Sequence, residues 1–308
     1  MEIRASEIEP ESAAAGNRPR VSVIIPHYND LTNLARCMGL LRAQTFPASD
    51  LEVIVADNNS RCGIEEVQRV CNGIARVIPA PIQGAGAARN AAVEASRGQF
   101  LAFIDSDCRP EPQWLERGVA ALETAQIVGG RVDVDYADPR NPTAVEAFER
   151  VFAFNFKRYI EQLGFSGTGN MFVSREIFDR VGGFRDRVAE DLDWGQRAVA
   201  AGYTFRYEPE AAVSHPARRT WPELRQKWAK SSREAFAATI ERPNGRLKWC
   251  LRSLAVLASP FIHWTAVARS KKLETWPQRM NAIGVLFRIR FWRFVESGRL
   301  LVNDLSTR

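Results

Sequence analysis

The amino-acid sequence predicts an α/β fold in which a sheet of buried strands is covered by helices and followed by a helical extension. Three observations indicate this. Apolar runs too short for helices recur in the first part of the chain and are typical of strands buried on both faces. Segments with apolar residues at helical spacing separate these runs. Residues 221–308 differ from the rest in charge and in tryptophan content.

The composition describes an ordinary folded protein. The chain has 308 residues, of which 45% are hydrophobic and 25% are charged, enough for one large α/β domain with an appendage. Its five cysteines are odd in number and include no Cys-x-x-Cys pair, and we expect no signal peptide at the amino end. These features favour a reducing, cytoplasmic location and argue against a zinc knuckle.

The chain begins with residues 1–20, which lack periodicity and predict a flexible lead-in. The first strand follows at Val21–Pro26 and is expected to end at its proline. Residues 31–44 predict a helix from the spacing of their leucines and methionine, and the second strand is Leu51–Ala56.

The same alternation continues to a central strand. Residues 64–72 predict a helix, 75–78 a short strand, and 84–98 a second helix before the apolar strand 100–104. Strands and helices in this order predict a parallel sheet with right-handed crossovers. Residues 21–107 therefore form a predicted nucleotide-binding half.

Two carboxylates, Asp105 and Asp107, follow this central strand directly. Ligands bind at the carboxyl ends of the strands in such sheets, and side-chain alternation in an extended chain would place both carboxylates on one side. Two hard oxygen ligands suit Mg²⁺ or Mn²⁺, which typically holds the phosphates of a nucleotide. Asp-x-Asp is a common pattern, and it recurs at residues 133–135 and 191–193 without a fully apolar strand before it.

Seven segments together resemble the ordered motifs of the family-two glycosyltransferases over about residues 20–220. They are Val23–Asn29, Val55–Ser60, Gly86–Asn90, Ile104–Asp107, Gly167–Met171, Val181–Phe184 and Glu190-Asp191. The resemblance implies a GT-A fold for residues 21–220, with a Rossmann-like mixed sheet flanked by helices and with residues 108–220 as the acceptor half. It also implies a metal-dependent, inverting hexosyltransferase that uses a nucleotide sugar.

The resemblance further implies roles for residues near the nucleotide. Pro26, Tyr28 and Asp30 would surround the nucleoside, and Asp57 would bind its base. The alternative for Asp57 is an Asx turn after a strand. Arg89 would reach a phosphate or pair with the first carboxylate of the acidic motif, or else be a solvated helix residue.

The implied metal site holds Mn²⁺ or Mg²⁺. In it Asp105 lies near the ribose and the metal, and Asp107 is the direct metal ligand. His215 would complete the metal shell or contact the pyrophosphate, although a lone histidine is more often structural.

The implied catalytic base is Asp191, which removes the proton of the acceptor hydroxyl. Its alternative role is to stabilise the amino end of the helix that follows. Gly169, Asn170, Glu190 and Trp194 are expected on the side of the donor sugar and the acceptor, where small residues let a substrate approach the backbone.

Residues 221–308 carry 17 Lys and Arg against 6 Asp and Glu, whereas the rest of the chain carries 25 against 30. Six of the eight tryptophans also lie in this tail. A basic, Trp-rich surface suits anionic lipid headgroups or nucleic acid, but no nucleic-acid-binding motif is recognisable. Leu224 and Lys227 stand where processive members of the family have the Gln and Arg of Gln-x-x-Arg-Trp, so we expect addition of a single sugar.

The tail predicts helices but no single membrane span. Residues 251–264 are its most apolar stretch and are shorter than the roughly 20 residues that a span needs. Residues 281–295 are imperfectly amphipathic because Arg290 falls on the apolar side. Peripheral contact with an anionic membrane is the expectation, and packing of these helices on the catalytic domain is the alternative.

We therefore expect an inverting transferase that moves a sugar from a UDP- or GDP-linked donor to a hydroxyl of a saccharide or lipid-linked saccharide. Surface polysaccharide or glycolipid assembly at the cytoplasmic face of a membrane is the expected setting. One alternative is a sugar-phosphate nucleotidyltransferase, but His27–Asp30 replace the Gly-rich basic loop that follows the first strand in those enzymes. Another alternative is a non-catalytic scaffold with the same fold.

Overall fold

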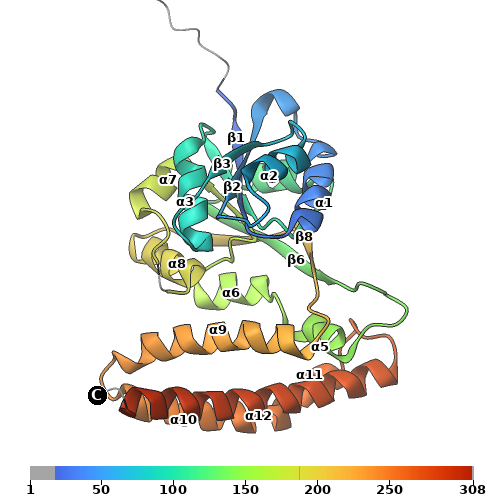
Figure 1. Ribbon diagram of the computed structural model, residues 1–308, viewed down its shortest axis with the longest axis vertical. Helices are drawn as coiled ribbons and strands as arrows, with labels where there is room; N and C mark the ends of the chain where they lie inside the picture. The colour runs from blue at the N-terminus through green and yellow to red at the C-terminus, as the bar shows by residue number, and fades with distance from the viewer. Residues whose placement is uncertain (1–17, 187, 307–308) are drawn as a thin grey trace, which may run out of the picture.

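The structure is a computed structural model that describes residues 18–186 and 188–306. The predicted flexible lead-in, residues 1–20, lies almost wholly outside the described residues. The chain forms an α/β body, and helices α9 to α12 form a layer beneath it, with α6 between α9 and the sheet (Figure 1). The predicted α/β fold with a helical region at the carboxyl end is confirmed.

Eight strands form one sheet in the order β3-β2-β1-β4-β7-β6-β8-β5. The pairs β3–β2, β2–β1, β1–β4 and β6–β8 are parallel, whereas β7 is antiparallel to both β4 and β6, and β5 is antiparallel to β8. The sheet is therefore mixed, with a parallel amino-terminal half. The strands are β1 (Val21–His27), β2 (Leu51–Asp57), β3 (Arg76–Pro79), β4 (Phe100–Ile104), β5 (Arg109–Pro110), β6 (Ile127–Asp135), β7 (Asn170–Ser174) and β8 (Phe205–Pro216).

Helices connect the strands and build the tail. Those of the α/β body are α1 (Leu31–Arg42), the 3₁₀ helix η1 (Ala48–Asp50), α2 (Ile64–Cys71), α3 (Ala85–Ala95), α4 (Trp114–Ala121), α5 (Ala144–Phe152), α6 (Phe156–Leu163), α7 (Arg175–Val181) and α8 (Glu190–Ala200). Those of the tail are α9 (Trp221–Ile240), α10 (Gly245–Ala258), α11 (Pro260–Ala268) and α12 (Trp276–Ser306).

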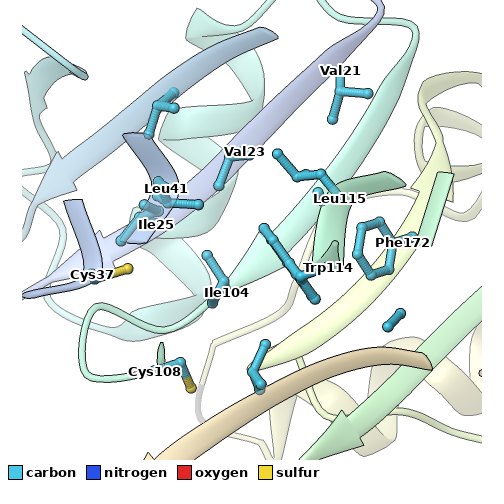
Figure 2. Packing of buried hydrophobic residues seen from close by; sticks show 14 of the residues in the cluster. Val21, Val23, Ile25, Cys37, Leu41, Ile104, Cys108, Trp114, Leu115 and Phe172 are labelled. Atoms are coloured by element: carbon cyan, nitrogen blue, oxygen red, sulfur yellow. The ribbon is translucent and has the colours of Figure 1, made fainter. Parts of the chain in front are cut away.

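Apolar side chains pack on both faces of the sheet. On one face, α1 and α4 cover β1, β4 and β7, and Figure 2 shows Trp114 beside Phe172 there, with ring centroids 5.1 Å apart. On the other face, α3, α7 and α8 cover the same strands through a second cluster that includes Phe103 and Trp194. Burial of the strands on both faces explains their nearly unbroken apolar sequence.

The first strand continues past the proline at which it was predicted to end. β1 pairs with β2 through His27, including Pro26 opposite Ala56, whereas β4 pairs with β1 only as far as Ile24. Pro26 therefore lies where the strand has a neighbour on one side alone, and proline is tolerated at such edge positions.

The tail packs on α5 through apolar side chains. Val145 and Phe148 of α5 join Leu224 of α9 and Leu286 and Ile289 of α12 in one buried cluster. Packing of these helices on the catalytic domain was the alternative to membrane contact, and it is observed on one face of this layer. Among the described helices, none is by itself long and apolar enough to cross a membrane, although α10 and α11 together meet that test as a pair bent by 41°.

The close packing of α4 on β7 predicts the effect of adding one methyl group. A Cβ at Gly118 would lie 2.2 Å from Cζ of Phe172, whereas a Cβ at Gly39 in α1 would meet nothing within 4 Å. We expect Gly118→Ala to lower the free energy of unfolding by about 1–3 kcal/mol through overpacking. Gly39→Ala should raise it by about 0.5–1 kcal/mol through helix propensity. Urea unfolding of both variants checks this, and equal stabilities would contradict the described packing.

Candidate active site

The two carboxylates after β4 lie in a turn. The strand ends at Ile104, and the amide of Cys108 donates to the carbonyl of Asp105 over 3.0 Å. The extended chain that was predicted to align Asp105 and Asp107 is therefore absent from these residues, and the turn brings them together instead. Ligand atoms of Asp105, Asp107 and Cys108 all lie within 4.8 Å of one another.

Arg89 on α3 joins this turn to the start of α8. The residue is 4% exposed, and its guanidinium lies 2.6 Å from Oδ1 of Asp105 and 3.2 Å from Oε1 of Glu190. Burial acts to lower the pKa of Arg89, but the surrounding carboxylates, Asp105 first, outweigh burial and raise it. Arg89 is therefore a buried, charged bridge, as its predicted pairing with Asp105 requires.

Asp191 lies in the first turn of α8, close to this bridge. The hydroxyl of Thr168 donates to Oδ1 of Asp191 over 2.7 Å. Burial raises the pKa of Asp191 to about 6, Glu190 acts in the same direction, and Arg89 opposes it. A carboxylate at a helix amino end is also stabilised by the helix dipole, so the catalytic and structural interpretations of Asp191 are compatible here.

His215 near the end of β8 contacts the second carboxylate of the turn. Its Nε2 lies 3.1 Å from Oδ2 of Asp107, and its Nδ1 lies 2.7 Å from the carbonyl of Pro216. Burial acts to lower the pKa of His215, but the hydrogen bond with Asp107 outweighs it and raises this pKa. Burial likewise acts to raise the pKa of Asp107, and the same hydrogen bond leaves it below its ordinary value.

The donor set at this turn fits a hard divalent cation. The carbonyl of Pro216 can only accept, so the proton of a neutral His215 resides on Nδ1 and the Nε2 lone pair faces Asp107. Orientation of a ligand histidine by a backbone carbonyl is typical of metal sites. Burial raises the pKa of the Cys108 thiol well above its ordinary value, so the oxygens of Asp105 and Asp107 and this nitrogen are the fitting donors.

A cavity of about 350 Å³ opens beside these groups. Asp105, Asp191 and His215 line one side of it, and Lys227, Trp228 and Ser231 of α9 line another. Its remaining wall is rich in aromatic rings from the segment around α5 and α6, namely Phe152, Phe154, Phe156, Tyr159 and Phe165. The cavity is therefore built by the α/β body and the tail together.

The motifs in the sequence did not predict the aromatic wall of the cavity. The alternation of Phe152, Phe154 and Phe156 along the chain is the one pattern in the sequence that indicates it. A wider groove of about 1110 Å³ continues along α9 and is lined by Asp107, Glu190 and Asp191 together with basic side chains. Those basic residues are Arg218, Arg219, Lys227, Lys230 and Arg233.

A buried carboxylate fixes the basic side of the groove to α5. Glu149 is 1% exposed, and Oε1 of its carboxylate lies 3.0 Å from the guanidinium of Arg218 and 3.2 Å from Nζ of Lys227. Burial acts to raise the pKa of Glu149, but Lys227 and Arg218 outweigh it and lower this pKa. Glu149 thus holds Lys227, which lines both the cavity and the groove, and Arg218, which lines the groove.

Only some of the residues expected around the nucleoside lie at this site. Asp30 caps α1, accepting from the amide of Asn33, and lines the groove, while Tyr28 is exposed. Asp57 is buried, with one carboxylate oxygen 3.2 Å from Nδ1 of His27 and the other accepting from the amide of Ser60. The amide of Ser60 lies three residues on, whereas the Asx turn given as the alternative for Asp57 uses the amide two residues on. Asp57 does not line the cavity or the groove.

The residues expected on the acceptor side divide into lining and core positions. Gly169 lines the cavity, and a Cβ there would lie 3.0 Å from Oδ2 of Asp105. Asn170 is fully buried, accepts from the indole of Trp114 and donates to the carbonyls of Arg131 and Ala211. Trp194 is also buried, and its indole donates to the carbonyl of Gly182. Glu190 lines the groove while paired with Arg89.

Comparisons with known proteins agree with this arrangement. Residues 22–182 match the family described as Glycosyl transferase family 2. The chain is 37% identical over 208 residues to the glycosyltransferase AglE of Haloferax volcanii, covering 65% of this chain and 68% of AglE. It is 32% identical over 226 residues to a pre-mycofactocin glycosyltransferase of Mycobacterium tuberculosis, covering 68% of this chain and 46% of that protein.

Two similar solved structures each contain a bound sugar nucleotide. The mannosyltransferase PcManGT from Pyrobaculum calidifontis, in complex with GDP-Man and Mn²⁺, has a TM-score of 0.57 at 21% identity. That match covers 93% of this chain and 88% of the PcManGT chain. Residues 1–349 of S. aureus TarS, in complex with UDP-GlcNAc, have a TM-score of 0.53 at 16% identity. That match covers 94% of this chain and 92% of the TarS chain. At these identities the likeness shows the fold.

The mixed sheet, the acidic turn at its carboxyl edge and these comparisons define the protein as a glycosyltransferase with a GT-A fold. The match over more than half of the chain identifies its family. The protein belongs to glycosyl transferase family 2, as its motifs predicted.

The bridge formed by Arg89 predicts a large loss of stability when it is removed. We expect Arg89→Met to lower the free energy of unfolding by about 3–5 kcal/mol, because Asp105 and Glu190 lose their buried partner. Arg180→Met is the matched control, since Arg180 pairs with Glu176 at the surface and should cost less than about 1 kcal/mol. Chemical unfolding of both variants measures this difference. Similar losses would show that Arg89 does not support the site.

Proposed function

We propose that this protein transfers a sugar from a UDP- or GDP-linked donor to a hydroxyl of a saccharide or lipid-linked saccharide, with inversion at the anomeric carbon. The observation that carries this proposal is the half-buried carboxylate of Asp191, whose pKa is raised and which lines the same cavity as Asp105 and His215. Further support comes from the similar proteins solved with GDP-Man or UDP-GlcNAc.

In the proposed reaction Asp191 accepts the proton of the acceptor hydroxyl. The hydroxyl oxygen forms a bond with the anomeric carbon, while the bond between that carbon and the diphosphate oxygen breaks and its electron pair leaves with the nucleoside diphosphate. One base and one displacement lead to inversion. A product of retained configuration in the NMR spectrum would contradict this mechanism.

Asp105, Asp107 and His215 would hold the divalent cation, Mn²⁺ or Mg²⁺, which when bound neutralises charge on the departing diphosphate. Arg89 keeps Asp105 in place, and Thr168 orients the carboxylate of Asp191. The aromatic wall of the cavity is suited to pack on the apolar face of an acceptor sugar and to exclude water.

We also propose that the tail contacts the inner face of the cell membrane peripherally. Large apolar side chains are exposed along α10, α11 and α12, beside the excess of basic residues in this part of the chain. Exposed apolar groups flanked by basic side chains are typical of helices that lie in a membrane interface. Surface polysaccharide or glycolipid assembly is the setting that fits such a location.

The acidic turn predicts that metal-dependent donor binding requires Asp107. Calorimetry with UDP and GDP, each with and without Mn²⁺, should detect binding by the unaltered chain and none that depends on the metal for Asp107→Asn. Asp133→Asn is the matched control, because Asp133 belongs to another Asp-x-Asp segment and pairs with Arg131 at the surface. Metal-dependent binding retained by the Asp107 variant would remove the assignment.

The raised pKa of Asp191 predicts the pH dependence of turnover. A base acts in its deprotonated form, so kcat/KM, which reports the free enzyme, should rise with pH through a midpoint near the pKa of about 6. Thr168→Val removes the hydroxyl that stabilises the carboxylate and should move this midpoint to higher pH. Asp191→Asn should lack measurable turnover. An unchanged midpoint in the Thr168 variant would assign the titration to another group.

A further inference from the structure

Three arginines in the tail lie close together without a carboxylate partner among the described residues. Arg252 belongs to α10, and Arg290 and Arg293 belong to α12. Arg293 is only 7% exposed, and the Nε atoms of Arg290 and Arg293 are buried without a hydrogen-bond partner. Buried guanidinium groups are normally paired, so this cluster needs an explanation.

Aromatic rings replace only part of the lost hydration. The guanidinium carbon of Arg293 lies 3.9 Å from the ring centroid of Trp228, and that of Arg252 lies 4.8 Å from the ring centroid of Trp249. Such contacts are favourable, but they neither neutralise the charge nor accept the N–H groups in the ring plane.

The carboxylates of the same helices are engaged with other residues. Glu296 pairs with Arg299 at 3.7 Å, and Asp304 pairs with Arg246 at 2.9 Å. The second pair joins α12 to α10, as does the indole of Trp249, which donates to the carbonyl of Ser297 over 3.1 Å. The two helices therefore hold the arginines close together.

The arginines also disfavour one another's charge. Burial lowers the pKa of Arg293 to about 9, and Arg290 and Arg252 add to this effect. Burial also lowers the pKa of Arg290, and Arg252 again contributes. An anion placed among the three groups would reverse both effects.

We propose that Arg252, Arg290 and Arg293 bind the phosphate headgroup of an anionic membrane phospholipid. This inference rests on the membrane contact in the proposed function and assigns residues to it. Guanidinium groups match the geometry of phosphate oxygens, which accept two parallel hydrogen bonds from one arginine. The three groups supply the donors and the charge that this headgroup requires.

The rim of the cluster favours a lipid over a free anion. Leu251 and Leu254 flank Arg252 along α10, and Phe287 and Phe291 flank Arg290 along α12, with all four side chains exposed. Phe261 on α11 is 73% exposed and packs edge-on against Phe287. Exposed apolar groups beside unpaired cations fit the boundary between headgroups and acyl chains.

The cluster also borders the candidate active site. Trp228 contacts Arg293 and lines the cavity, and the ring of Phe152, another lining residue, lies 6.3 Å from that of His263 on α11. A phospholipid held by the cluster would bring the cavity next to the bilayer surface, where an acceptor anchored in that bilayer is available.

The test separates phosphate recognition from net charge. Vesicles of phosphatidylcholine, with and without phosphatidylglycerol, are sedimented with the full chain. We expect Arg252→Lys with Arg290→Lys to weaken binding to the anionic vesicles about tenfold, because lysine keeps the charge but loses the paired hydrogen bonds. Arg242→Lys with Arg269→Lys, the same exchange at two exposed positions of the tail, should bind like the unaltered chain.

Each other outcome has a defined meaning. Equal vesicle binding by the cluster variant and the unaltered chain would overturn the inference, because net charge alone would then explain the contact. Full release of the unaltered chain from the vesicles by inorganic phosphate, at a concentration equal to that of the lipid phosphate, would also overturn the inference. Binding of the chain only to neutral vesicles that contain added polyprenyl phosphate would overturn it as well. Circular dichroism and calorimetric nucleotide binding of the same variants show that the fold and the donor site remain. Lack of vesicle binding by the unaltered chain would instead reject the membrane contact itself.

Discussion

The buried guanidinium of Arg89 is the contact on which the site depends. It joins three elements that are far apart in the sequence, because α3 supplies the arginine, the turn after β4 supplies Asp105, and α8 supplies Glu190. Two acidic groups beside a proposed metal site would repel each other without this cation. Arg89 therefore allows carboxylates to be concentrated at one edge of the sheet, while burial outweighs the opposing effect of Arg89 and keeps the pKa of Asp191 raised.

The antiparallel strand β7 explains how the two halves of the site meet. It lies between β4 and β6, so the chain segment before it, which includes Thr168 and Gly169, reaches the carboxyl end of β4. Gly169 leaves room for Asp105, and Thr168 binds Asp191. The parallel half of the sheet thus supplies the acidic turn, and the mixed half supplies the groups that orient the proposed base.

The sequence predicted the family and the fold because ordered motifs carry the residues that the chemistry needs. Asp105, Asp107 and His215 do lie together, although the turn, and not strand alternation, brings the carboxylates side by side. Asn170 and Trp194 stand in the same motifs but are core residues, because a motif does not reveal which of its side chains are buried. The aromatic wall and the bridge from Glu149 to Lys227 depend on how the tail packs, which local patterns do not encode.

The shared cavity has a consequence for how such enzymes diversify. Lys227, Trp228 and Ser231 reach this cavity from α9. The acidic turn and the side chains that would bind the cation belong wholly to the α/β body. With the proposed assignment, exchanging the carboxyl-terminal segment between relatives would change which acceptor is recognised and leave the choice of donor intact. Evolution can thus recombine the two preferences separately, provided that each new segment keeps a cation for the buried Glu149.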